Sequence, residues 1–335
     1  MKFCARCLLP ETYPKLEIDS KGTCNVCEAY RVKFNRPGAE AGAEAFRQAV
    51  HASKENRFIL TCSGGIDSSY AMLLCKRKYG LDIIGANFNH GFQTDIAVAN
   101  LKQLSERLNV PIVSITPDFS VLYRLYREFL VKTGDFCTPC CQGCCRAGFL
   151  VARQNRIRTI FHGGVSGSRV EFNVLGMLRH HYERAMKIIG STYHASELEG
   201  LLTPTQAIQD FNLVSLPQYE EWDERKIIRR LKDEMGWRAL PDGRTRHVDC
   251  IVADVSDHLL QKKFGFSKQW MAVSANLRAG FLDIEEGRQM IKHQEAHIAE
   301  EPKEAMNYLL NKLKLTREEV YALPHYKSRP AFVSL

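Results

Sequence analysis

The chain has 335 residues, of which 45% are hydrophobic and 25% are charged. The length excludes a disulfide-stapled mini-protein, and the proportions are close to those of globular proteins, so they exclude wholesale disorder and a fibrous repeat. The 46 Lys and Arg residues outnumber the 38 Asp and Glu residues, an excess that suits a nucleotide, a sugar phosphate or RNA without selecting among them. No apolar run reaches the roughly 18 to 20 residues of a membrane span, and the first residues lack a signal-peptide pattern. We therefore expect a cytoplasmic protein with no membrane partner.

Four cysteines open the chain as two C-x2-C pairs, Cys4 with Cys7 and Cys24 with Cys27. In a reducing compartment this spacing is typical of a structural zinc site, in which two knuckles supply four thiolates to a tetrahedral ion. A segment of about 30 residues buries too little apolar surface to fold without such a metal. We predict a Zn²⁺-binding finger over residues 1–30. Its role is to dock and orient, because four protein thiolates leave no position for a substrate.

A linker and a helix are expected over residues 31–56, followed by a β-prone run at 57–62, a glycine loop at 63–69 and a helical pattern from Tyr70. Two adjacent glycines let the backbone approach an anion, and the N–H groups and dipole at the helix start favour a phosphate. The next expected elements are strand 81–89, helix 94–108 and strand 111–115. This alternation predicts an α/β fold with a doubly wound parallel sheet and ligands at the carboxyl ends of its strands.

Five of the twelve cysteines lie within nine residues: Cys137, Cys140, Cys141, Cys144 and Cys145. If residues 138–151 are helical, these thiols share one face. Three interpretations stay open: packing of small apolar side chains, a ligand set for a metal or iron–sulfur cluster, and a persulfide or disulfide relay. A cluster would take Cys137, Cys140, Cys141 and Cys144. The isolated Cys75 and Cys250 are interpreted as packing residues.

The α/β domain is expected to span residues 57–216, and a mostly helical region residues 217–335. Helical periods at 268–296 and 303–323 would cap the site or form a homodimer contact. The basic segment 225–232 carries apolar residues between its charges, which is typical of the solvated face of a surface helix. RNA is therefore the less favoured partner.

The loop sequence Ser63-Gly64-Gly65-Ile66-Asp67-Ser68, between a strand and a helix, resembles the pyrophosphate loop of the PP-loop ATPases, with their HUP-like α/β fold. Those enzymes split ATP between the α and β phosphates, attach AMP to a substrate oxygen, and let a nitrogen or sulfur nucleophile displace it. The resemblance implies ATP and Mg²⁺ as cofactors. It also implies that Ser63, Gly64, Gly65 and Ser68 hold pyrophosphate, that Asp67 helps to hold Mg²⁺, and that Asn87 and Phe88 face the adenine.

A closer resemblance covers most of the chain. The finger and a series of later blocks are similar, in order, to N-acetyl sugar amidotransferases of bacterial surface-polysaccharide biosynthesis. The blocks lie at residues 217–223, 236–238, 247–250, 263–267, 278–280 and 285–287. Those enzymes convert a sugar acetamido group into an acetamidino group with ammonia from a separate glutaminase. Because this chain carries no glutaminase motif, the resemblance implies a sugar substrate and an ammonia-donating partner protein.

The thiol-rich segment 137–145 departs from that family, in which a single C-x2-C would suffice. It resembles sulfur-inserting members of the superfamily, which thiolate a nucleobase or a tRNA base. Sulfur transfer through this segment, with a sulfur-donating partner, is therefore the alternative to amidation. The candidate catalytic residues are Asp67, Cys137, Cys140 and Cys141. His162, at the end of a β-prone run, and the pair His247 and Asp249 lie in or near the expected site.

Overall fold

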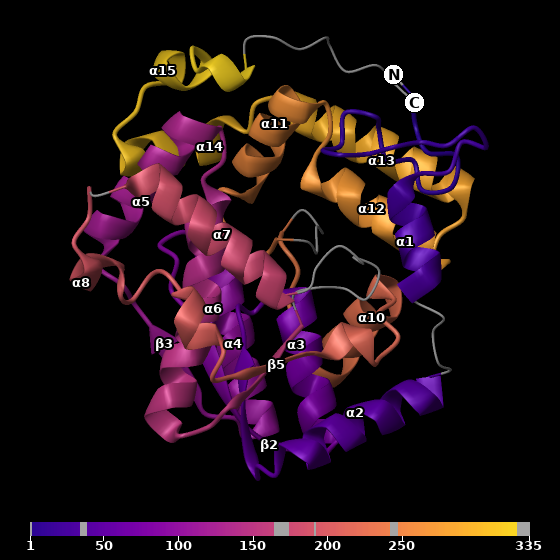
Figure 1. Ribbon diagram of the computed structural model, residues 1–335, viewed down its shortest axis with the longest axis vertical. Helices are drawn as coiled ribbons and strands as arrows, with labels where there is room; N and C mark the ends of the chain where they lie inside the picture. The colour runs from indigo at the N-terminus through magenta and orange to yellow at the C-terminus, as the bar shows by residue number, and fades with distance from the viewer. Residues whose placement is uncertain (1, 34–38, 164–173, 191, 242–246, 327–335) are drawn as a thin grey trace.

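The computed structural model describes residues 2–33, 39–163, 174–190, 192–241 and 247–326 (Figure 1). At its centre is a five-stranded parallel sheet in the order β3-β2-β1-β4-β5. The strands are β1 (Arg57–Thr61), β2 (Asp82–Phe88), β3 (Ile112–Ile115), β4 (Thr159–His162) and β5 (Asn212–Ser215). The strand order reverses between β1 and β4, which is the position where doubly wound sheets bind ligands. The predicted doubly wound parallel sheet is confirmed.

Helices cover both faces of this sheet. One face carries α2 (Ala39–Ser53), α3 (Ile66–Leu73) with its π-helical turn η1 (Leu74–Lys78), α4 (Asp95–Leu108) and α10 (Glu224–Met235). The other carries α6 (Cys137–Asn155), with α5 (Phe119–Thr133) and α7 (Val174–Ile189) packed on α6. The short elements α8 (Ala195–Leu198) and α9 (Thr205–Ile208) precede β5 along the chain, and η2 (Leu216–Gln218) follows it directly.

Helix α4 shows how the sequence pattern produces these elements. Its buried residues Leu101, Leu104 and Leu108 recur at the helical spacing that forms one apolar stripe. The side chain of Thr94 accepts a hydrogen bond from Ala97 N and caps the first turn, and Asn109 ends the helix in the left-handed region. The predicted range 94–108 therefore matches the helix to within one residue.

Two glycines let α6 approach the sheet closely. A Cβ on Gly143 would lie 2.3 Å from the ring of Phe88 at the end of β2, and one on Gly148 would lie 2.7 Å from the Thr61 side chain at the end of β1. Because α6 connects β3 to the parallel strand β4, it runs against the strand direction, and its first turns lie at the carboxyl ends of the strands. The cysteine-rich start of α6 therefore lies at the edge where a ligand is expected.

The N-terminal finger packs on the C-terminal helices. It is closed by two isolated antiparallel bridges, Phe3 with Pro10 and Ile18 with Cys24, and ends in α1 (Asn25–Lys33). The indole N–H of Trp270 donates to Leu8 O at 2.9 Å, and the ring of Phe3 stacks on that indole. Between the cysteine pairs the backbone forms one bridge, Ile18 with Cys24, rather than a strand ladder.

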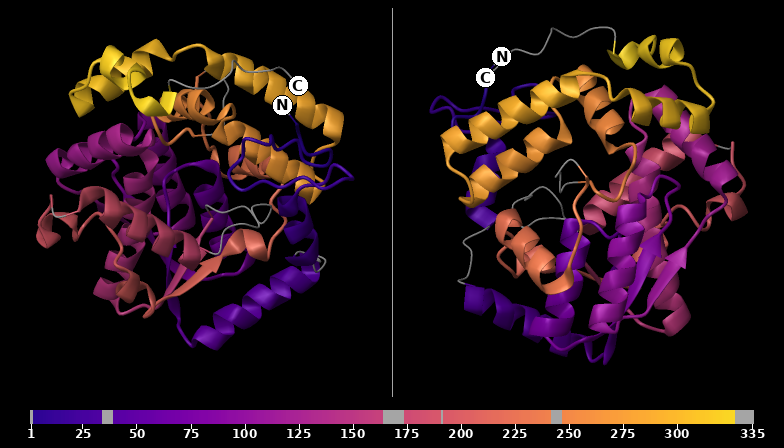
Figure 2. Two further views of the ribbon diagram at one scale, coloured as in Figure 1. Left: turned by 45° about the horizontal axis from the view of Figure 1, so that its top comes forward. Right: turned by 180° about the vertical axis from the view of Figure 1, so that it is seen from behind.

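The C-terminal region is helical, as expected, with α11 (Ala253–Phe264), α12 (Lys268–Ala279), α13 (Ile284–Ala299), α14 (Lys303–Leu313), α15 (Arg317–Tyr321) and the turn η3 (Pro324–Tyr326). Figure 2 shows these helices at the end of the molecule opposite α2. The helical pattern predicted over 268–296 forms two helices rather than one. Gly280 ends α12 with a φ of +74°, and Asp283 caps α13. Across the described ranges, no helix has the length and apolar character of a membrane span.

Candidate functional site

The glycine loop joins β1 to α3 at the carboxyl edge of the sheet. Gly64 has a φ of +83°, which L side chains rarely adopt, and a Cβ there would lie 2.3 Å from the carbonyl oxygen of Ala97. Gly65 is the N-cap residue of α3 and has no side chain to accept the first N–H groups of the helix. The loop therefore offers an uncovered helix N-terminus, which is the geometry that binds a phosphate.

The hydroxyl groups of the loop lie together. Ser68 Oγ accepts a hydrogen bond from Ser63 N at 3.1 Å and lies 3.4 Å from Ser63 Oγ. The indole N–H of Trp222 donates to one carboxylate oxygen of Asp67 at 2.7 Å. The structure thus brings Ser63, Ser68 and both glycines into one cradle, with Asp67 held at its side by a residue from a distant segment.

Three further side chains support the loop, and sequence reasoning missed the first two. The carbonyl oxygen of Gly64 accepts hydrogen bonds from Trp237 Nε1 at 3.0 Å and from Asn100 Nδ2 at 3.3 Å. Asp249 Oδ2 would lie 3.1 Å from a Cβ on Gly65, so its carboxylate faces the loop. Trp237 and Asp249 lie in the sequence blocks at 236–238 and 247–250, whereas Asn100 has no feature that separates it from the rest of its helix.

The end of β2 is packed into the protein. Asn87 is 4% exposed, donates to Ser114 Oγ and accepts from Gln93 Nε2. Phe88 is 2% exposed, and its ring lies against Gly143. These side chains therefore have structural partners of their own within the protein. Their contact with adenine stays a prediction.

Two buried imidazoles flank the loop, because β2 and β4 are the neighbours of β1. His162 ends β4, its Nε2 has no hydrogen-bond partner, and burial lowers the pKa of His162 to about 4. His90 follows β2, its Nε2 lies 3.1 Å from Asp249 O, and its Nδ1 has no partner. Burial outweighs the effect of Asp249 and lowers the pKa of His90. Both rings are therefore neutral at pH 7, and each has one unused nitrogen.

The four N-terminal cysteines form a compact buried group. Cys4 Sγ lies 3.8 Å from Cys27 Sγ, and Cys7 Sγ lies 3.7 Å from Cys24 Sγ. Four thiolates around a tetrahedral Zn²⁺, at about 2.3 Å from the metal, are about 3.8 Å apart. All four sulfur atoms lie within 4.8 Å of one another. The donor set and its spacing therefore fit one structural metal ion.

The cysteines of α6 do not share one face. Cys137, Cys140 and Cys144 pack against the apolar cluster that contains Tyr126, Cys145 packs toward the sheet, and Cys141 is exposed. At 3.6 residues per turn these five positions spread over about 140° of the helix, which is wider than one contact. Within the described ranges, only the N-terminal four bring three or more potential metal ligands within 4.8 Å. The α6 cysteines therefore do not form a site for a single ion.

Cys250 and Lys268 join the α6 cysteines from distant segments. Burial, followed by the neighbouring thiols of Cys140 and Cys137, raises the pKa of Cys250. Lys268 Nζ lies 3.0 Å from Cys137 Sγ and 2.7 Å from Ser256 Oγ. Cys250 was interpreted as a packing residue and Lys268 only as a helix start, because their spacing along the chain does not connect them with α6.

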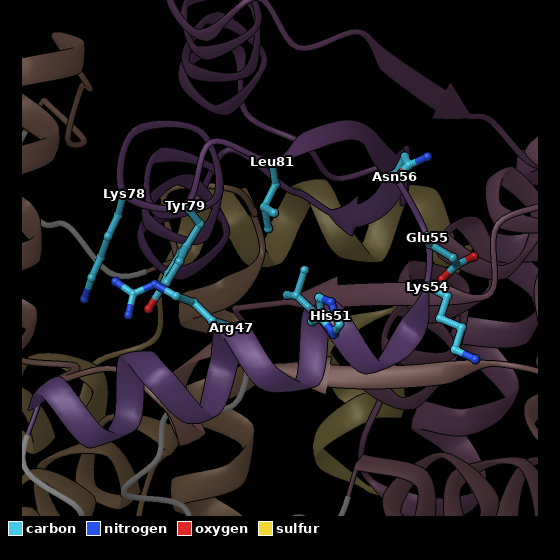
Figure 3. A pocket seen from close by; sticks show the side chains of 9 residues that line it. Arg47, His51, Lys54, Glu55, Asn56, Lys78, Tyr79 and Leu81 are labelled. Carbon is cyan, nitrogen blue, oxygen red and sulfur yellow. The ribbon is translucent and has the colours of Figure 1, made fainter.

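A cavity of about 480 Å³ lies away from this site, between α2 and the start of β2 (Figure 3). Its lining is basic, with Arg47, Lys54 and Lys78. Lys78 pairs with Glu220 at 2.7 Å, and the Arg47 guanidinium lies 5.9 Å from the centre of the Tyr79 ring. This cavity is at the amino end of the strands, so it is separate from the phosphate loop.

A groove of about 500 Å³ lies between α10 and helices α11 to α13. Its lining includes Asp223, which directly follows Trp222, the residue whose indole N–H donates to Asp67. Its charged lining is mainly acidic, because Asp223, Glu224, Asp254 and Glu286 accompany a single Arg225. Arg225 itself pairs with Glu286 at 3.0 Å. A polyanion is therefore poorly suited to this groove.

Comparison with known proteins adds one family match. Residues 242–331 match the model of a family described as "LPS biosynthesis protein WbpG-like, C-terminal domain". This match agrees with the resemblance of the C-terminal blocks to sugar amidotransferases, for the part of the chain that it covers. Comparison with curated proteins gives no match.

Two solved structures are similar to the chain at low identity. One is U34-tRNA thiolase NcsA from Methanococcus maripaludis with its 4Fe-4S cluster, at 13% identity, covering 84% of this chain and 86% of that chain with a TM-score of 0.35. The other is NAD+ synthetase from Burkholderia pseudomallei, at 15% identity, covering 65% of this chain and 96% of that chain with a TM-score of 0.29. At these TM-scores and identities, neither similarity is used to assign residues of the site.

Proposed function

We propose that the protein uses ATP to adenylate a substrate oxygen and then replaces that oxygen with nitrogen. The observation that carries the proposal is the phosphate cradle at residues 63–68, placed where the strand order reverses. The WbpG-like match of residues 242–331 supports a surface-polysaccharide sugar as the acceptor. The expected products are AMP, pyrophosphate and an acetamidino sugar.

The chemistry assigns roles to residues of the loop. The acetamido oxygen attacks the α phosphorus of ATP, and pyrophosphate leaves with the bonding electron pair while the N–H groups at the start of α3, with Ser63 and Ser68, stabilise its charge. Mg²⁺ would add Lewis-acid stabilisation of the same charge. Asp67 and Asp249, the two carboxylates beside the loop, are the residues suited to hold it. Ammonia then adds to the carbon, AMP leaves, and one proton is released.

Ammonia would come from a separate protein, and the four-cysteine finger would hold Zn²⁺. The sulfur spacing of 3.7 to 3.8 Å supports the zinc assignment. The contact between the finger and Trp270 supports a role in fixing the C-terminal helices over the site. The acidic groove beside Asp223 favours a neutral sugar ring over RNA, because nucleic-acid sites are built from cations that neutralise phosphates.

Sulfur transfer to a nucleobase or tRNA base is the second candidate. The observation in its favour is that Cys137, Cys140 and Cys250 pack against the same apolar cluster, although Cys250 comes from a distant segment. The acidic groove weighs against an RNA acceptor, so amidation is preferred.

The test supplies the purified chain with ATP, Mg²⁺, ¹⁵N-ammonium and a panel of N-acetylated nucleotide sugars. We expect acceptor-dependent release of AMP and pyrophosphate, and one ¹⁵N atom per product by mass spectrometry. Free ammonium bypasses a missing partner, so glutamine alone should give no product. Release of ADP and phosphate without AMP would refute the central claim, and sulfur incorporation from a persulfide donor without any nitrogen incorporation would favour the second candidate.

A matched pair of variants tests the loop assignment. Asp67→Asn should reduce Mg²⁺-dependent turnover at least tenfold with little change in unfolding. Asp95→Asn makes the same change in the first turn of α4, where the side chain is exposed, and should leave turnover unchanged. Equal effects of the two variants would remove Asp67 from the site.

A further inference from the structure

Cys137, in the first turn of α6, has the amine of a distant lysine beside its sulfur atom. Lys268 begins α12, and its Nζ donates to Cys137 Sγ at 3.0 Å. Ser256, on α11, completes the contact, because its Oγ accepts from Lys268 Nζ at 2.7 Å and lies 3.1 Å from Cys137 Sγ. A thiol, an amine and a hydroxyl from three helices therefore touch one another. The adenylation chemistry at the phosphate loop requires none of the three.

The amine of Lys268 is held in its charged form. Burial opposes that charge, but the negative charges of Cys137, Asp257 and Asp135 outweigh burial and raise the pKa of Lys268. Asp257 also accepts a hydrogen bond from Lys268 N at 3.1 Å, so its carboxylate faces the start of α12. A cation beside a sulfur atom stabilises negative charge on it, and the thiolate is the nucleophilic form of cysteine. The pair therefore joins a nucleophile to a proton donor.

Both partners can be reached from solvent. The side chains of Cys137 and Lys268 are partly exposed. Cys62 and Cys75 are buried instead, and burial raises the pKa of Cys62 to about 12. Because oxidation follows exposure and thiolate character, a small peroxide should react at Cys137 rather than at these buried thiols.

We propose that a peroxide oxidises this pair to a covalent sulfur–nitrogen bond between Cys137 Sγ and Lys268 Nζ. The thiolate attacks one oxygen of the peroxide, the O–O bond breaks, and the leaving hydroxide takes a proton from the Lys268 ammonium. The products of this step are a sulfenic acid, water and a neutral amine. The amine then attacks the sulfur, the S–O bond breaks, and a second water leaves with a proton from the nitrogen. Sulfur loses two electrons, and one peroxide is reduced.

The geometry favours the amine over a second thiol as the group that attacks the sulfenic acid. The nitrogen of Lys268 already contacts Cys137 Sγ. Cys140, one turn further along α6, is the competitor. A hydrogen bond with Cys144, followed by burial, raises the pKa of Cys140, so this thiol stays protonated at pH 7 and is a poor nucleophile.

The bond ties the start of α6 to the start of α12. Cys137 and Lys268 are 131 positions apart, so the bond closes a long loop and lowers the entropy of the unfolded chain. Helix α12 also carries Trp270, whose indole N–H donates to Leu8 O in the finger. Oxidation therefore fastens the finger and the C-terminal helices to the α/β domain. The inference goes beyond the proposed function and holds whichever nucleophile displaces AMP.

The test treats the full-length chain, as purified, with a small molar excess of hydrogen peroxide. Remaining thiols are blocked with iodoacetamide, and tryptic peptides are measured by mass spectrometry. We expect peptide 133–146, which contains Cys137, joined to peptide 264–278, in which trypsin fails to cleave after the modified Lys268. The joined mass should be the sum of the two peptides less two hydrogen atoms. Dithiothreitol should separate them, and the oxidised chain should unfold at a higher temperature than the reduced chain.

Matched variants assign the bond to its two atoms. Lys268→Arg keeps the positive charge, but a guanidinium stays protonated and does not attack the sulfur. This variant and Cys137→Ser should each lower the joined peptide at least tenfold and remove the rise in unfolding temperature. Lys262→Arg and Cys141→Ser change an exposed lysine and an exposed cysteine nearby and should retain both. Thermal unfolding without peroxide shows whether each variant is folded, and Lys268→Gln replaces Lys268→Arg if that variant is not.

Four outcomes would overturn the proposal. The first is a disulfide between Cys137 and Cys140 as the main product in the wild type. The second is oxidation of Cys137 to a sulfinic acid without any joined peptide. The third is a joined peptide that persists in Lys268→Arg. The fourth is a joined peptide heavier by one oxygen atom, which would replace the direct bond by an N–O–S bridge.

Discussion

The finger and the thiol group at α6 use the same residue type in opposite ways. The four sulfur atoms of the finger come from 24 consecutive positions, 4–27, and two of them accept backbone N–H groups from within that segment. At the start of α6, Cys137 instead contacts Ser256 and Lys268, which lie more than 100 residues later in the chain. A site built from neighbours in sequence therefore depends on local chain geometry. A site built from distant segments depends on the packing of the whole domain.

The phosphate loop combines both kinds of construction. Its cradle is local, because Ser63, Gly64 and Ser68 lie within six residues. Its support is distant, because Trp222 and Trp237 reach it from the C-terminal half of the chain. Substitutions in the local part of a site should therefore abolish binding there. Substitutions of distant supporting residues should cost only the free energy of a single contact.

The largest effect is expected at the finger. Replacing Cys4 and Cys24 together by serine should remove about one zinc per chain, because binding of a structural zinc contributes of order 10 kcal/mol to folding of its segment. Residues 1–30 should then unfold, and the C-terminal helices should lose the contact between Trp270 and Leu8. Elemental analysis and thermal unfolding measure both results. Cys141→Ser, at an exposed thiol, is the control and should change neither. Unchanged zinc content in the double variant would end the finger assignment.

The next effect is at the local part of the phosphate loop. Gly64→Ala should destabilise the fold by several kcal/mol and abolish ATP binding, because the new Cβ adds left-handed strain of about 1 to 2 kcal/mol and also overlaps the carbonyl of Ala97. Gly80→Ala is the matched control, since Gly80 has a φ of +63° with nothing within 4 Å of a Cβ, and it should cost the strain alone. Urea unfolding measures the loss of stability, and calorimetric titration with ATP measures the loss of ATP binding. If the two variants behave alike, close packing of the loop is not required.

The contrast between local and distant construction also explains what the sequence could reveal. The parallel sheet, the loop and the range of α4 follow from patterns within a few residues, and the structure agrees with them. The end of α12 at Gly280 was missed, because a single glycine between two helical periods does not distinguish a stop from a tolerated interior residue. The split of the α6 thiols was also missed, because it depends on which neighbours each side of the helix meets.

The distant parts of the site were the least accessible to sequence reasoning. The side chain of Asn100 forms hydrogen bonds with the carbonyl oxygen of Gly64 and with the backbone of Arg238. No pattern near Asn100 in the sequence predicts these contacts. Cys250 looked like an isolated thiol because its partners lie in another element. Only the tertiary structure shows which of these distant residues contact one another.

An effect of intermediate size is expected at His162, at the buried edge of the site, when the pH is lowered. His162 titrates near 6.5 when unfolded, and burial lowers its pKa to about 4 in the folded chain. A lowered folded pKa means that its contribution is complete above pH 6.5 and is lost as the pH falls toward 4. The difference corresponds to at most about 3 kcal/mol. His162→Asn should therefore lose less stability than the wild type between pH 7 and pH 4.5, measured by urea unfolding.

The control for this experiment is His293→Asn, because His293 is exposed. That variant should follow the wild type across the same range. Other buried histidines, including His90 and His258, also have lowered pKa values, so the informative quantity is the difference between His162→Asn and the wild type. Parallel pH profiles of those two proteins would show that His162 is not held neutral.

The smallest effect is expected at a distant support. Trp222→Phe keeps a ring against Tyr70, whose edge-on contact has a centroid distance of 5.1 Å, but removes the N–H that donates to Asp67. Loss of one such hydrogen bond should cost about 1 kcal/mol of stability. It should also raise the Mg²⁺ concentration needed for half-maximal ATP binding by a few fold, because Asp67 would no longer be held in one orientation. Trp237→Phe is the matched comparison: it removes a donor to Gly64 O while Asn100 remains, so it should lower stability without changing the Mg²⁺ requirement. If Trp222→Phe also leaves that requirement unchanged, this indole is a packing residue, and the orientation of Asp67 is set within the loop itself.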